Sequence, residues 1–470
     1  MVFSSLFFIF FFLPLILIFY FLTKSDKIRN IILVLFSLVF YAWGEPVWFV
    51  LLIISAIVDY LNGIFVENNK DSRIAMLGVV STLIFNLGLL CTFKYADFFI
   101  ENLNFVLGTS FKAPGLILPI GISFYTFQTI SYTIDVYNGK VKAQRSFLNF
   151  LTFVTLFPQL VAGPIVRYSI IQNQLSSRKI DWEGFNQGIE RFCKGLFKKV
   201  AIANTAGAIA SQLLDKDINS LSFFGGWIGL LIFGLQVYYD FSGYSDMAIG
   251  LGKMFGFKFN ENFNHPYTSK SITDFWRKWH MSLSTWLSDY IFTPLMIQFR
   301  DYRIVSLIIA TITTFFVSGL WHGASWNFVL WGLYFGFWVL IESLLIGKYL
   351  KKFPKIFQHI YFLLLIIPSW MLFYFTDFNK IISFSRVIFN FSKISADIES
   401  VLLIKENIFW MIFAIAFSMP VYKKIVKLID RIDNANIKNV INTSITISLF
   451  MISIILLVGS TYNPFLYFRF

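Results

Sequence analysis

Charged residues are scarce in this chain. Asp, Glu, Lys and Arg together make up 14% of its 470 residues, whereas 57% are hydrophobic and 20% are aromatic. A water-soluble domain carries roughly 25% charged residues, because its surface has to be solvated. The composition therefore excludes a soluble globular protein and indicates that lipid solvates much of the exterior.

Cysteine is also rare, and several catalytic motifs are missing. Cys91 and Cys193 both lie beside apolar stretches without metal-ligand spacing, so we expect two packing residues, no disulfide framework and no metal site. The chain contains no nucleotide-binding loop and no G-x-S-x-G, H-E-x-x-H or C-x-x-C segment. These absences count against a P-loop pump, a serine esterase and an intramembrane zinc protease.

Long apolar runs are what the sequence has in place of charge. Residues 3–22 contain no charged residue and are about as long as a helix that crosses a hydrocarbon core of roughly 30 Å. The run has no basic start and no small-residue cleavage site after it, so we expect a retained first span rather than a signal peptide. Further candidate spans lie near residues 31–43, 47–66, 75–93, 115–134, 147–166, 200–214, 222–250, 304–320, 324–347, 357–376, 404–420 and 441–460.

These runs predict an all-α fold. Inside a bilayer the backbone has to satisfy its own hydrogen bonds, and the runs are far too long for barrel strands. We expect a polytopic integral membrane protein with about a dozen transmembrane or re-entrant helices. No hydrophilic stretch is long enough for a separate soluble domain, and no internal repeat is visible. Residues 1–470 are therefore expected to form a single membrane-embedded domain.

The net charge of +13 has an explanation in the membrane. The basic residues cluster between the candidate spans, where the positive-inside rule and the attraction of anionic head groups would place them. We therefore expect membrane lipids, and no nucleic acid, as partners of these clusters. Segments 167–199 and 421–440 set apolar residues at helical spacing among charged ones, which predicts amphipathic helices in the membrane interface.

Polar residues within apolar sequence concentrate between about residues 118 and 345, the motif-bearing core. Polar groups in a membrane interior are costly and usually face a cavity or a partner, so function is expected there. The most informative is His322, because residues 304–341 around it contain no Lys, Arg, Asp or Glu.

A lone histidine in a helical core is commonly a packed residue, and this interpretation has to be weighed for His322. Its small neighbours, among them Gly319 and Gly323, predict room for a ligand to approach the imidazole. Trp321 and Trp326 predict rigid walls beside it. An ionisable group at membrane depth is also a candidate functional residue by default.

His280 lies in the segment SITDFWRKWHMSLSTWLSDYIFTPL. Ser271 and Asp274 form an S-x-x-D start signal, so a helix is predicted to begin there. Trp276, Trp279 and His280 would then share one helix face by their i, i+3, i+4 spacing.

The same segment carries basic residues that would point elsewhere. Arg277, Lys278 or Lys270 could hold the phosphates of an acyl donor at the mouth of a cavity. An aromatic and basic helix start is also common as an interfacial anchor, so both interpretations stay open.

Two more polar groups lie in apolar surroundings. Asp240 and Asp246, in DFSGYSDMAIGLG, fall on different helix faces unless Gly243 breaks the helix. They could bind a cation, hold an active-site histidine or satisfy broken backbone. Gln159, in FPQLVAGPI, stands near glycine and proline, which are tolerated where a helix lines a cavity.

Taken together, these segments resemble a known family. WRKWHMSLSTWLSDYIFTPL, SGLWHGASWNFVLWGLYFG, DFSGYSDMAIGLGKMFGF and FPQLVAGPI resemble the membrane-bound O-acyltransferases and stand in the expected order. The N-terminal FSSLFFIFFFLPL…FYAWGEP and the C-terminal NPFLYFRF resemble the bacterial alginate O-acetyltransferase branch. The resemblance covers nearly the whole chain.

The resemblance implies a ring of tilted helices around a thinned centre, with a central tunnel that reaches a catalytic histidine. That histidine, in the W-H-G-x-x-W segment, maps onto His322, and a second catalytic position maps onto His280. The candidates for substrate binding are Trp321, Trp326, Trp276, Arg277, Lys278, Asp240 and Gln159.

The function that the resemblance implies is O-acetyl transfer in a bacterial inner membrane. A neutral imidazole can take the proton of a hydroxyl whose oxygen attacks a thioester carbonyl. We expect acetyl-CoA as the donor, no permanently bound cofactor, and a hydroxyl acceptor on an extracytoplasmic polysaccharide or an acetyltransferase partner protein. A transporter or flippase for a lipid or polysaccharide precursor is the alternative, which the lack of repeat symmetry disfavours.

Overall fold

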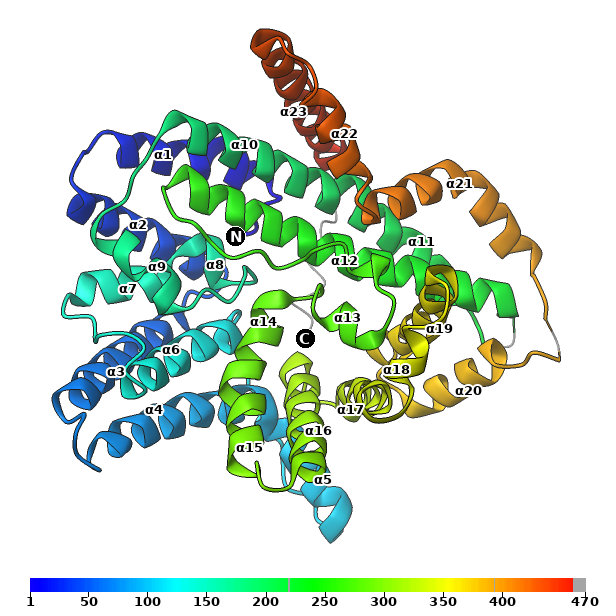
Figure 1. The fold of residues 1–470 in the computed structure, drawn as a ribbon, viewed down its shortest axis with the longest axis horizontal. Coiled ribbons are helices and arrows are strands. Elements are labelled where there is room, and N and C mark those ends of the chain that lie inside the picture. The colour runs from blue at the N-terminus through cyan, green and yellow to red at the C-terminus, as the bar shows by residue number, and fades with distance from the viewer. Residues whose placement is uncertain (219, 393, 460–470) are drawn as a thin grey trace. The chain divides into compact units, whose positions relative to one another are not determined.

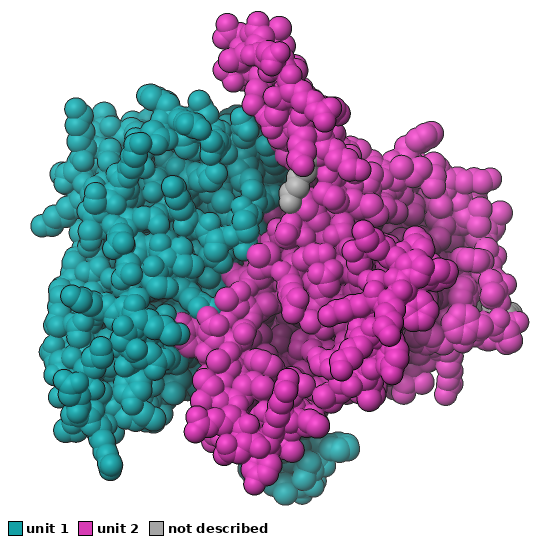
Figure 2. Space-filling view, viewed as in Figure 1, with its two compact units in different colours: residues 1–195, 244–261 teal, residues 196–243, 262–470 magenta. Residues whose placement is uncertain are grey.

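The computed structural model describes residues 1–218, 220–392 and 394–459, and these ranges contain helices and connecting loops but no strand. The all-α prediction is therefore confirmed for this part of the chain. By their internal contacts the residues divide into two compact units, coloured separately in Figure 2. Unit 1 is Met1–Gly195 with Tyr244–Glu261, and unit 2 is Leu196–Gly243 with Asn262–Phe470. The segment NPFLYFRF lies outside the described residues, and a single domain stays a prediction.

The helices of the N-terminal part of the chain, of which Figure 1 labels α1 to α10, belong to unit 1 except for Leu196 and Phe197 of α10. They are η1 (Phe8–Phe12), α1 (Leu13–Phe21), α2 (Asp26–Ala42), α3 (Phe49–Asn68), α4 (Ala75–Leu90), η2 (Cys91–Tyr95), α5 (Ala96–Leu107), α6 (Ile122–Tyr137), α7 (Phe147–Thr155), α8 (Phe157–Leu160), α9 (Tyr168–Ser176) and α10 (Trp182–Phe197).

The remaining helices belong largely to unit 2; α12 contributes its last part, from Tyr244, to unit 1. They are η3 (Lys198–Ala203), α11 (Asn204–Leu214), α12 (Phe223–Met254), η4 (Pro266–Thr268), α13 (Ile272–Trp276), α14 (Met281–Leu287), η5 (Ser288–Phe292), α15 (Thr293–Gln298), α16 (Arg303–His322), α17 (Trp326–Ile341), η6 (Glu342–Ile346), α18 (Gly347–Leu350), α19 (Lys355–Tyr374), α20 (Phe378–Ile388), α21 (Ile398–Ser418), α22 (Val421–Ile429) and α23 (Ala435–Val458).

Seven helical segments of the described residues are long and apolar enough to cross a membrane. They match the predicted spans that begin near residues 47, 75, 304, 324, 357, 404 and 441, so the multi-pass prediction is confirmed for these. The seven are Phe49–Asn68, Ala75–Leu107, Arg303–His322, Trp326–Leu350, Lys355–Tyr374, Ile398–Ser418 and Ala435–Val458. The larger count of about a dozen stays a prediction.

Proline and glycine interrupt two of the other predicted spans. The run 147–166 is divided into α7 and the short α8, which begins around Pro158, a residue that has no N–H to continue a helix. In the run 115–134 the helix α6 begins only after Gly121, whose φ is +79°. A Cβ at Gly121 would lie 2.8 Å from the carbonyl oxygen of Leu160, so this start of α6 requires glycine.

The two predicted amphipathic segments have different outcomes. Within 167–199, α10 buries Phe192 but leaves Trp182 79% exposed. Segment 421–440 is not one helix, because α22 ends at Ile429 and the side chain of Asn434 caps α23. The amphipathic helix predicted from Val421, Ile425, Leu428 and Ile432 is present as α22, but it ends at Ile429, before the last of these residues.

Unit 1 buries a carboxylate among three of its helices. Asp59 of α3 is fully buried, and Nδ2 of Asn86 from α4 donates to its two oxygens at 3.1 and 2.9 Å. The amide oxygen of Asn86 in turn accepts hydrogen bonds from Ser55 at 3.0 Å and from Thr129 of α6 at 3.3 Å. One amide therefore ties α3, α4 and α6 together and compensates the burial of the carboxylate.

We expect Asn86→Ala to lower the free energy of unfolding by on the order of 1 kcal/mol, because it removes hydrogen bonds between membrane-embedded helices. Unfolding of the protein in lipid nanodiscs would measure this loss. Asn62→Ala is a matched control, since that amide is half-buried and bonds the hydroxyls of Ser81 and Thr82 and not the carboxylate of Asp59. An Asn86→Ala protein as stable as the wild type would contradict the expectation.

Candidate functional site

His322 is the last residue of α16, where the chain leaves the helix through the extended backbone of Gly323. Its imidazole is buried, with 2% of the residue exposed. Three rings meet it at steep angles, with centroid distances of 5.1 Å for Trp321, 4.9 Å for Trp331 and 5.6 Å for Phe373. The walls of the imidazole are therefore aromatic on several sides.

The glycines beside His322 serve helix packing. A Cβ at Gly323 would collide with the ring of Phe328, and a Cβ at Gly319 would collide with the carbonyl oxygen of Phe328. The prediction that these glycines leave room for a ligand is therefore wrong, because α17 fills the space. Trp326, the second predicted wall, is 48% exposed at the start of α17.

The helix that was predicted to begin after Ser271 and to contain His280 ends before it reaches His280. The side chain of Ser271 accepts the N–H of Asp274 at 3.0 Å, as the start signal predicts, but α13 stops at Trp276. The backbone N–H groups of Lys278 and Trp279 then both donate to the carbonyl oxygen of Phe275. The prediction that Trp276, Trp279 and His280 share one helix face is therefore wrong. All three residues are nevertheless buried.

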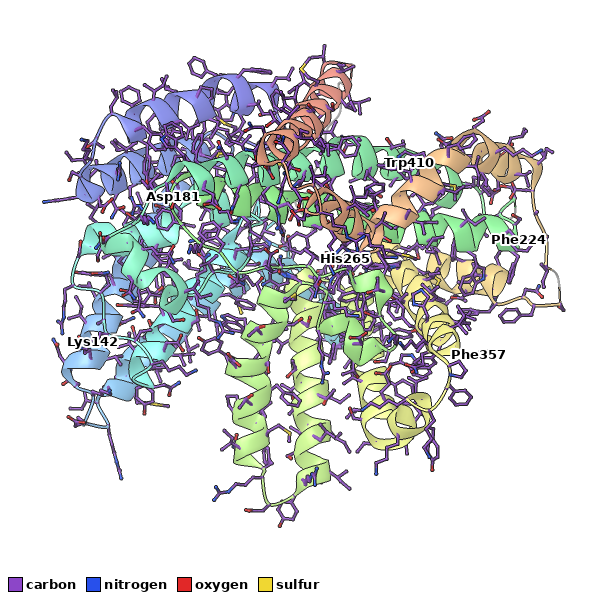
Figure 3. All side chains as sticks on the ribbon, turned by 45° about the horizontal axis from the view of Figure 1, so that its top comes forward. Lys142, Asp181, Phe224, His265, Phe357 and Trp410 are labelled. Atoms are coloured by element: carbon purple, nitrogen blue, oxygen red, sulfur yellow. The ribbon has the colours of Figure 1, made fainter. Side chains whose placement is uncertain are left out.

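His280 has a left-handed backbone, with φ 42° and ψ 52°, directly before α14. Apart from glycines, only His280 and His265 have positive φ in the part of the chain that the structure describes. Such a conformation costs roughly 1–2 kcal/mol for a residue with a Cβ and persists where its surroundings enforce it. His265, labelled in Figure 3, lies in the same unit with its Nδ1 3.4 Å from the carbonyl oxygen of Ser418.

The surroundings that enforce this conformation centre on Asn262. Its side-chain Oδ1 lies 3.1 Å from Nδ1 of His280 and accepts the N–H and the hydroxyl of Ser282 at 3.2 and 2.8 Å. The backbone carbonyl of Asn262 accepts the N–H of Met281 at 2.9 Å. One buried asparagine therefore holds both the first turn of α14 and the ring of His280.

His280 and His322 meet the same indole. The ring of Trp321 has its centroid 5.7 Å from that of His280 and 5.1 Å from that of His322. Burial lowers the pKa of His280 well below its usual range, and the proximity of His322 lowers it further, because a second positive charge nearby is disfavoured. His280, which lies outside the membrane-length helices, is therefore neutral at physiological pH.

Further aromatic rings enclose this part of unit 2. Trp276 meets Trp331 edge-on at 5.7 Å, and Trp279 packs on Phe275 at 5.3 Å and on Trp370 at 5.5 Å. We call the buried rings from α13, α17, α19 and the loop before α14 the aromatic frame. It consists of Phe275, Trp276, Trp279, Trp331, Phe335, Trp370 and Phe373.

A carboxylate anchors α13 at the edge of the aromatic frame. Glu342, buried at the end of α17, accepts the N–H groups of Ile272 and Thr273 at 2.7 and 2.8 Å and the hydroxyl of Thr273 at 2.6 Å. A negative charge at the first turn of a helix is favourable, because the N–H groups there have no partner within the helix. Glu342 thus fixes the segment that carries Trp276.

The basic residues of this segment lie outside the aromatic frame. Arg277 is exposed, whereas the ammonium group of Lys278 is 2.8 Å from the carboxylate of Asp274. Of these two candidates for binding phosphate, Arg277 is thus the one that the structure exposes.

Asp240 and Asp246 lie on the single continuous helix α12, which Gly243 does not break. Within unit 2, Asp240 forms a buried ion pair with Lys199, with 2.5 Å between Oδ1 and Nζ. Within unit 1, Asp246 forms an ion pair with Arg191 at 2.6 Å. Each aspartate therefore faces a lysine or arginine of its own unit.

Gln159, the remaining candidate, belongs to unit 1. It is fully buried in α8, and its Nε2 donates to the carbonyl oxygen of Phe153 at 2.5 Å. This bond gives Gln159 a structural task within unit 1, and its role in substrate binding stays a prediction.

The sequence analysis missed Asn262, Trp331, Phe373 and Glu342. Asn262 has a weak signal, the polar run NENFNHP in the connection between α12 and α13. Glu342 is the first charged residue after a long uncharged run, which marks it as a group that needs a partner. Trp331 and Phe373 give no signal, because an aromatic residue in an apolar helix is common.

The described residues contain no group of three or more His, Cys, Asp or Glu side chains that could hold a metal ion. The expectation of no metal stays a prediction, as does the assignment of catalytic roles to His322 and His280.

Comparisons with known proteins now give the family. The family model for MBOAT, the membrane-bound O-acyltransferase family, matches residues 141–385, which include the segments of both histidines. The chain is 40% identical over 386 residues to the probable alginate O-acetylase AlgI of Azotobacter vinelandii, covering 79% of this chain and 75% of that protein.

Two other relatives carry different names. The peptidoglycan O-acetyltransferase of Helicobacter pylori is 31% identical over 519 residues, covering 100% of this chain and 98% of that protein. The teichoic acid D-alanyltransferase of Bacillus subtilis is 30% identical over 227 residues, covering 47% of this chain and 57% of that protein. With a model that matches half of its length and relatives that align over most of it, the chain belongs to the membrane-bound O-acyltransferase family.

Proposed function

We propose that the protein is an O-acetyltransferase that moves an acetyl group from a cytoplasmic thioester, acetyl-CoA, to a hydroxyl of an extracytoplasmic polysaccharide or of a partner protein. The names of relatives that O-acetylate alginate and peptidoglycan support the reaction. The observation that carries the proposal is the pair of buried imidazoles, His280 and His322, which meet one indole beside the aromatic frame.

The step is a direct transfer. The acceptor oxygen attacks the thioester carbonyl carbon and forms the new C–O bond, while His322 takes the hydroxyl proton. The C–S bond then breaks, and the leaving thiolate takes the proton from His322, so no net proton is gained or lost. A histidine can act this way only while it is neutral. Burial among aromatic rings keeps out the water that would hydrolyse the thioester.

The length of α16 limits the depths at which His322 can lie in the membrane. The 20 residues of α16 give a rise of about 30 Å, which equals the thickness of a typical hydrocarbon core. His322 ends this helix, so the imidazole reaches mid-depth only if the bilayer is thinned there or if α16 begins outside the hydrocarbon. We propose such a thinned centre, with a tunnel from the cytoplasmic side and an acceptor opening on the other.

The acceptor is proposed only as a class. Relatives are named for two different polysaccharides, alginate and peptidoglycan, and one is named for teichoic acid. A hydroxyl of a carbohydrate, or of a protein that passes the acetyl group on, would suit the same base. Mass spectrometry of cell-envelope glycans from a deletion strain would identify the acetylated polymer.

We expect His322→Ala to reduce acetyl transfer by about 10²–10⁴-fold, the usual contribution of a general base. Radiolabelled acetyl-CoA supplied to membranes measures the transfer, and thermal unfolding shows whether the variant is folded. His359→Ala is the matched control, since that imidazole bonds the carbonyl oxygen of Ser269 and not the indole of Trp321. Normal transfer by folded His322→Ala would overturn the proposal, and flux of a polysaccharide precursor that survives the change would favour a transporter.

For donor binding we expect Arg277→Ala to raise KM for acetyl-CoA more than it lowers kcat, because a phosphate contact stabilises the ground and transition states alike. Lys278→Ala should raise KM less, since Lys278 already pairs with Asp274. Steady-state kinetics over a range of acetyl-CoA concentrations separate the two constants. A loss confined to kcat would instead mean that the segment orients the reacting groups.

A further inference from the structure

We infer that Asn262 is a positioning residue that fixes the tautomer of His280, with the proton on Nδ1 and the lone pair on Nε2. The proton on Nδ1 follows from the hydrogen-bond geometry, and the lone pair on Nε2 follows from that geometry together with the neutrality of the buried imidazole. The consequence of this tautomer for the reaction rests on the proposed function.

The first step is the orientation of the Asn262 amide. An asparagine side chain can be turned so that its oxygen and nitrogen exchange places, and hydrogen-bond partners decide between the two. Here the backbone N–H of Ser282 points at the side-chain atom at 3.2 Å. A backbone N–H can only donate, so that atom has to be the oxygen, Oδ1.

The second step concerns the ring of His280. Its Nδ1 lies 3.1 Å from the same Oδ1, and an amide oxygen can only accept hydrogen bonds. Nδ1 therefore carries the proton and donates it. A neutral imidazole has a single N–H, so Nε2 of His280 carries the lone pair.

The third step is rigidity. Asn262 is buried and is also held through its backbone carbonyl by the N–H of Met281 at 2.9 Å. The backbone N–H of Asn264 donates to the carbonyl oxygen of Lys278 at 3.0 Å, which holds the segment around Asn262 against the segment before His280. The ring of Phe241, 4.6 Å from that of His280 and perpendicular to it, limits ring rotation. The tautomer is thus built into the fold.

The consequence is a division of roles. With its lone pair on Nε2, neutral His280 can accept a hydrogen bond from an acceptor hydroxyl, but it cannot donate one from Nε2 to the oxyanion that develops on the thioester carbonyl. Because the attacking hydroxyl has a single proton, which His322 takes in the proposed step, Asn262 makes His280 an acceptor that orients a polysaccharide through a neighbouring hydroxyl.

The charges around His280 leave this assignment intact. The titratable group that faces it from α16 is His322. On α12, Asp240 pairs with Lys199, and beside α13 Asp274 pairs with Lys278. The amide oxygen of Asn262 is the group that bonds Nδ1 of His280, so it sets the proton position there.

The test is magnetic resonance of the full-length protein in lipid bilayers with ¹⁵N- and ¹³C-labelled histidine. The chain has only four histidines, and His280→Asn assigns the signal, because asparagine tolerates a left-handed backbone. We expect His280 with its proton on Nδ1 in the wild type. We expect the proton on Nε2 in Asn262→Ala. A wild-type His280 protonated on Nε2, or an unchanged tautomer in Asn262→Ala, would overturn the inference.

Enzyme kinetics supply the second arm. Asn262→Ala should lower kcat about 10-fold or more with little change in KM for acetyl-CoA, because it alters orientation and not donor binding. Asn262→Asp keeps the acceptor oxygen and so keeps the Nδ1 proton, but its carboxylate raises the pKa of His280. The acid limb of the kcat profile should then move to higher pH. An acid limb that stays in place would overturn the role in the reaction.

Control variants distinguish a wrong tautomer from a folding defect and from a failure of the proposed function. Asn264→Ala removes an exposed amide from the same loop and should change neither tautomer nor kcat. Should Asn262→Ala fail to fold, Asn262→Asp still tests the inference, because it retains both bonds to Ser282. A wild type with the expected tautomer but no acetyl transfer would refute the proposed function and leave the tautomer standing.

Discussion

In unit 2, aromatic rings enclose the buried His280 and His322, where a polar group costs free energy unless it forms a hydrogen bond. This constraint explains why one amide, that of Asn262, meets the side chains of His280 and Ser282 together. It also explains why the buried carboxylate of Glu342 accepts hydrogen bonds from the first N–H groups of α13. The chemistry proposed for the imidazoles depends on the same exclusion of water.

Helix interruptions are the means by which the fold brings these groups together. A continuous helix through residues 271–287 would have carried His280 on one face with Trp276 and would have denied Asn262 its bonds. Instead, α13 ends at Trp276, and the left-handed backbone of His280 lets the chain change direction before α14 begins. The strain is local, and four hydrogen bonds of Asn262 compensate it.

The sequence predicted the all-α class, the long apolar spans and the histidine segments, because these depend on composition and periodicity. It predicted the cap of Ser271 but not the end of α13, since the chain after that end is held by bonds of Asn262 and Asn264, which are distant from the cap in sequence. It predicted that Gly319 and Gly323 leave space for a ligand, whereas both allow the close packing of Phe328 from α17. Whether a small residue makes space for a ligand or for a neighbouring helix depends on what packs there, which no local pattern contains.

The close approach of α16 and α17 also bears on how the protein is made. Their backbones meet where Gly319 lies against Phe328, and only residues 323–325 connect the two helices. Neither helix contains a lysine, arginine or acidic residue after Arg303 and before Glu342. The two therefore suit insertion into the bilayer as one hairpin during synthesis. Inserted as a pair, they bring Trp331 of α17 against the imidazole of His322 before Phe373 of α19 joins it.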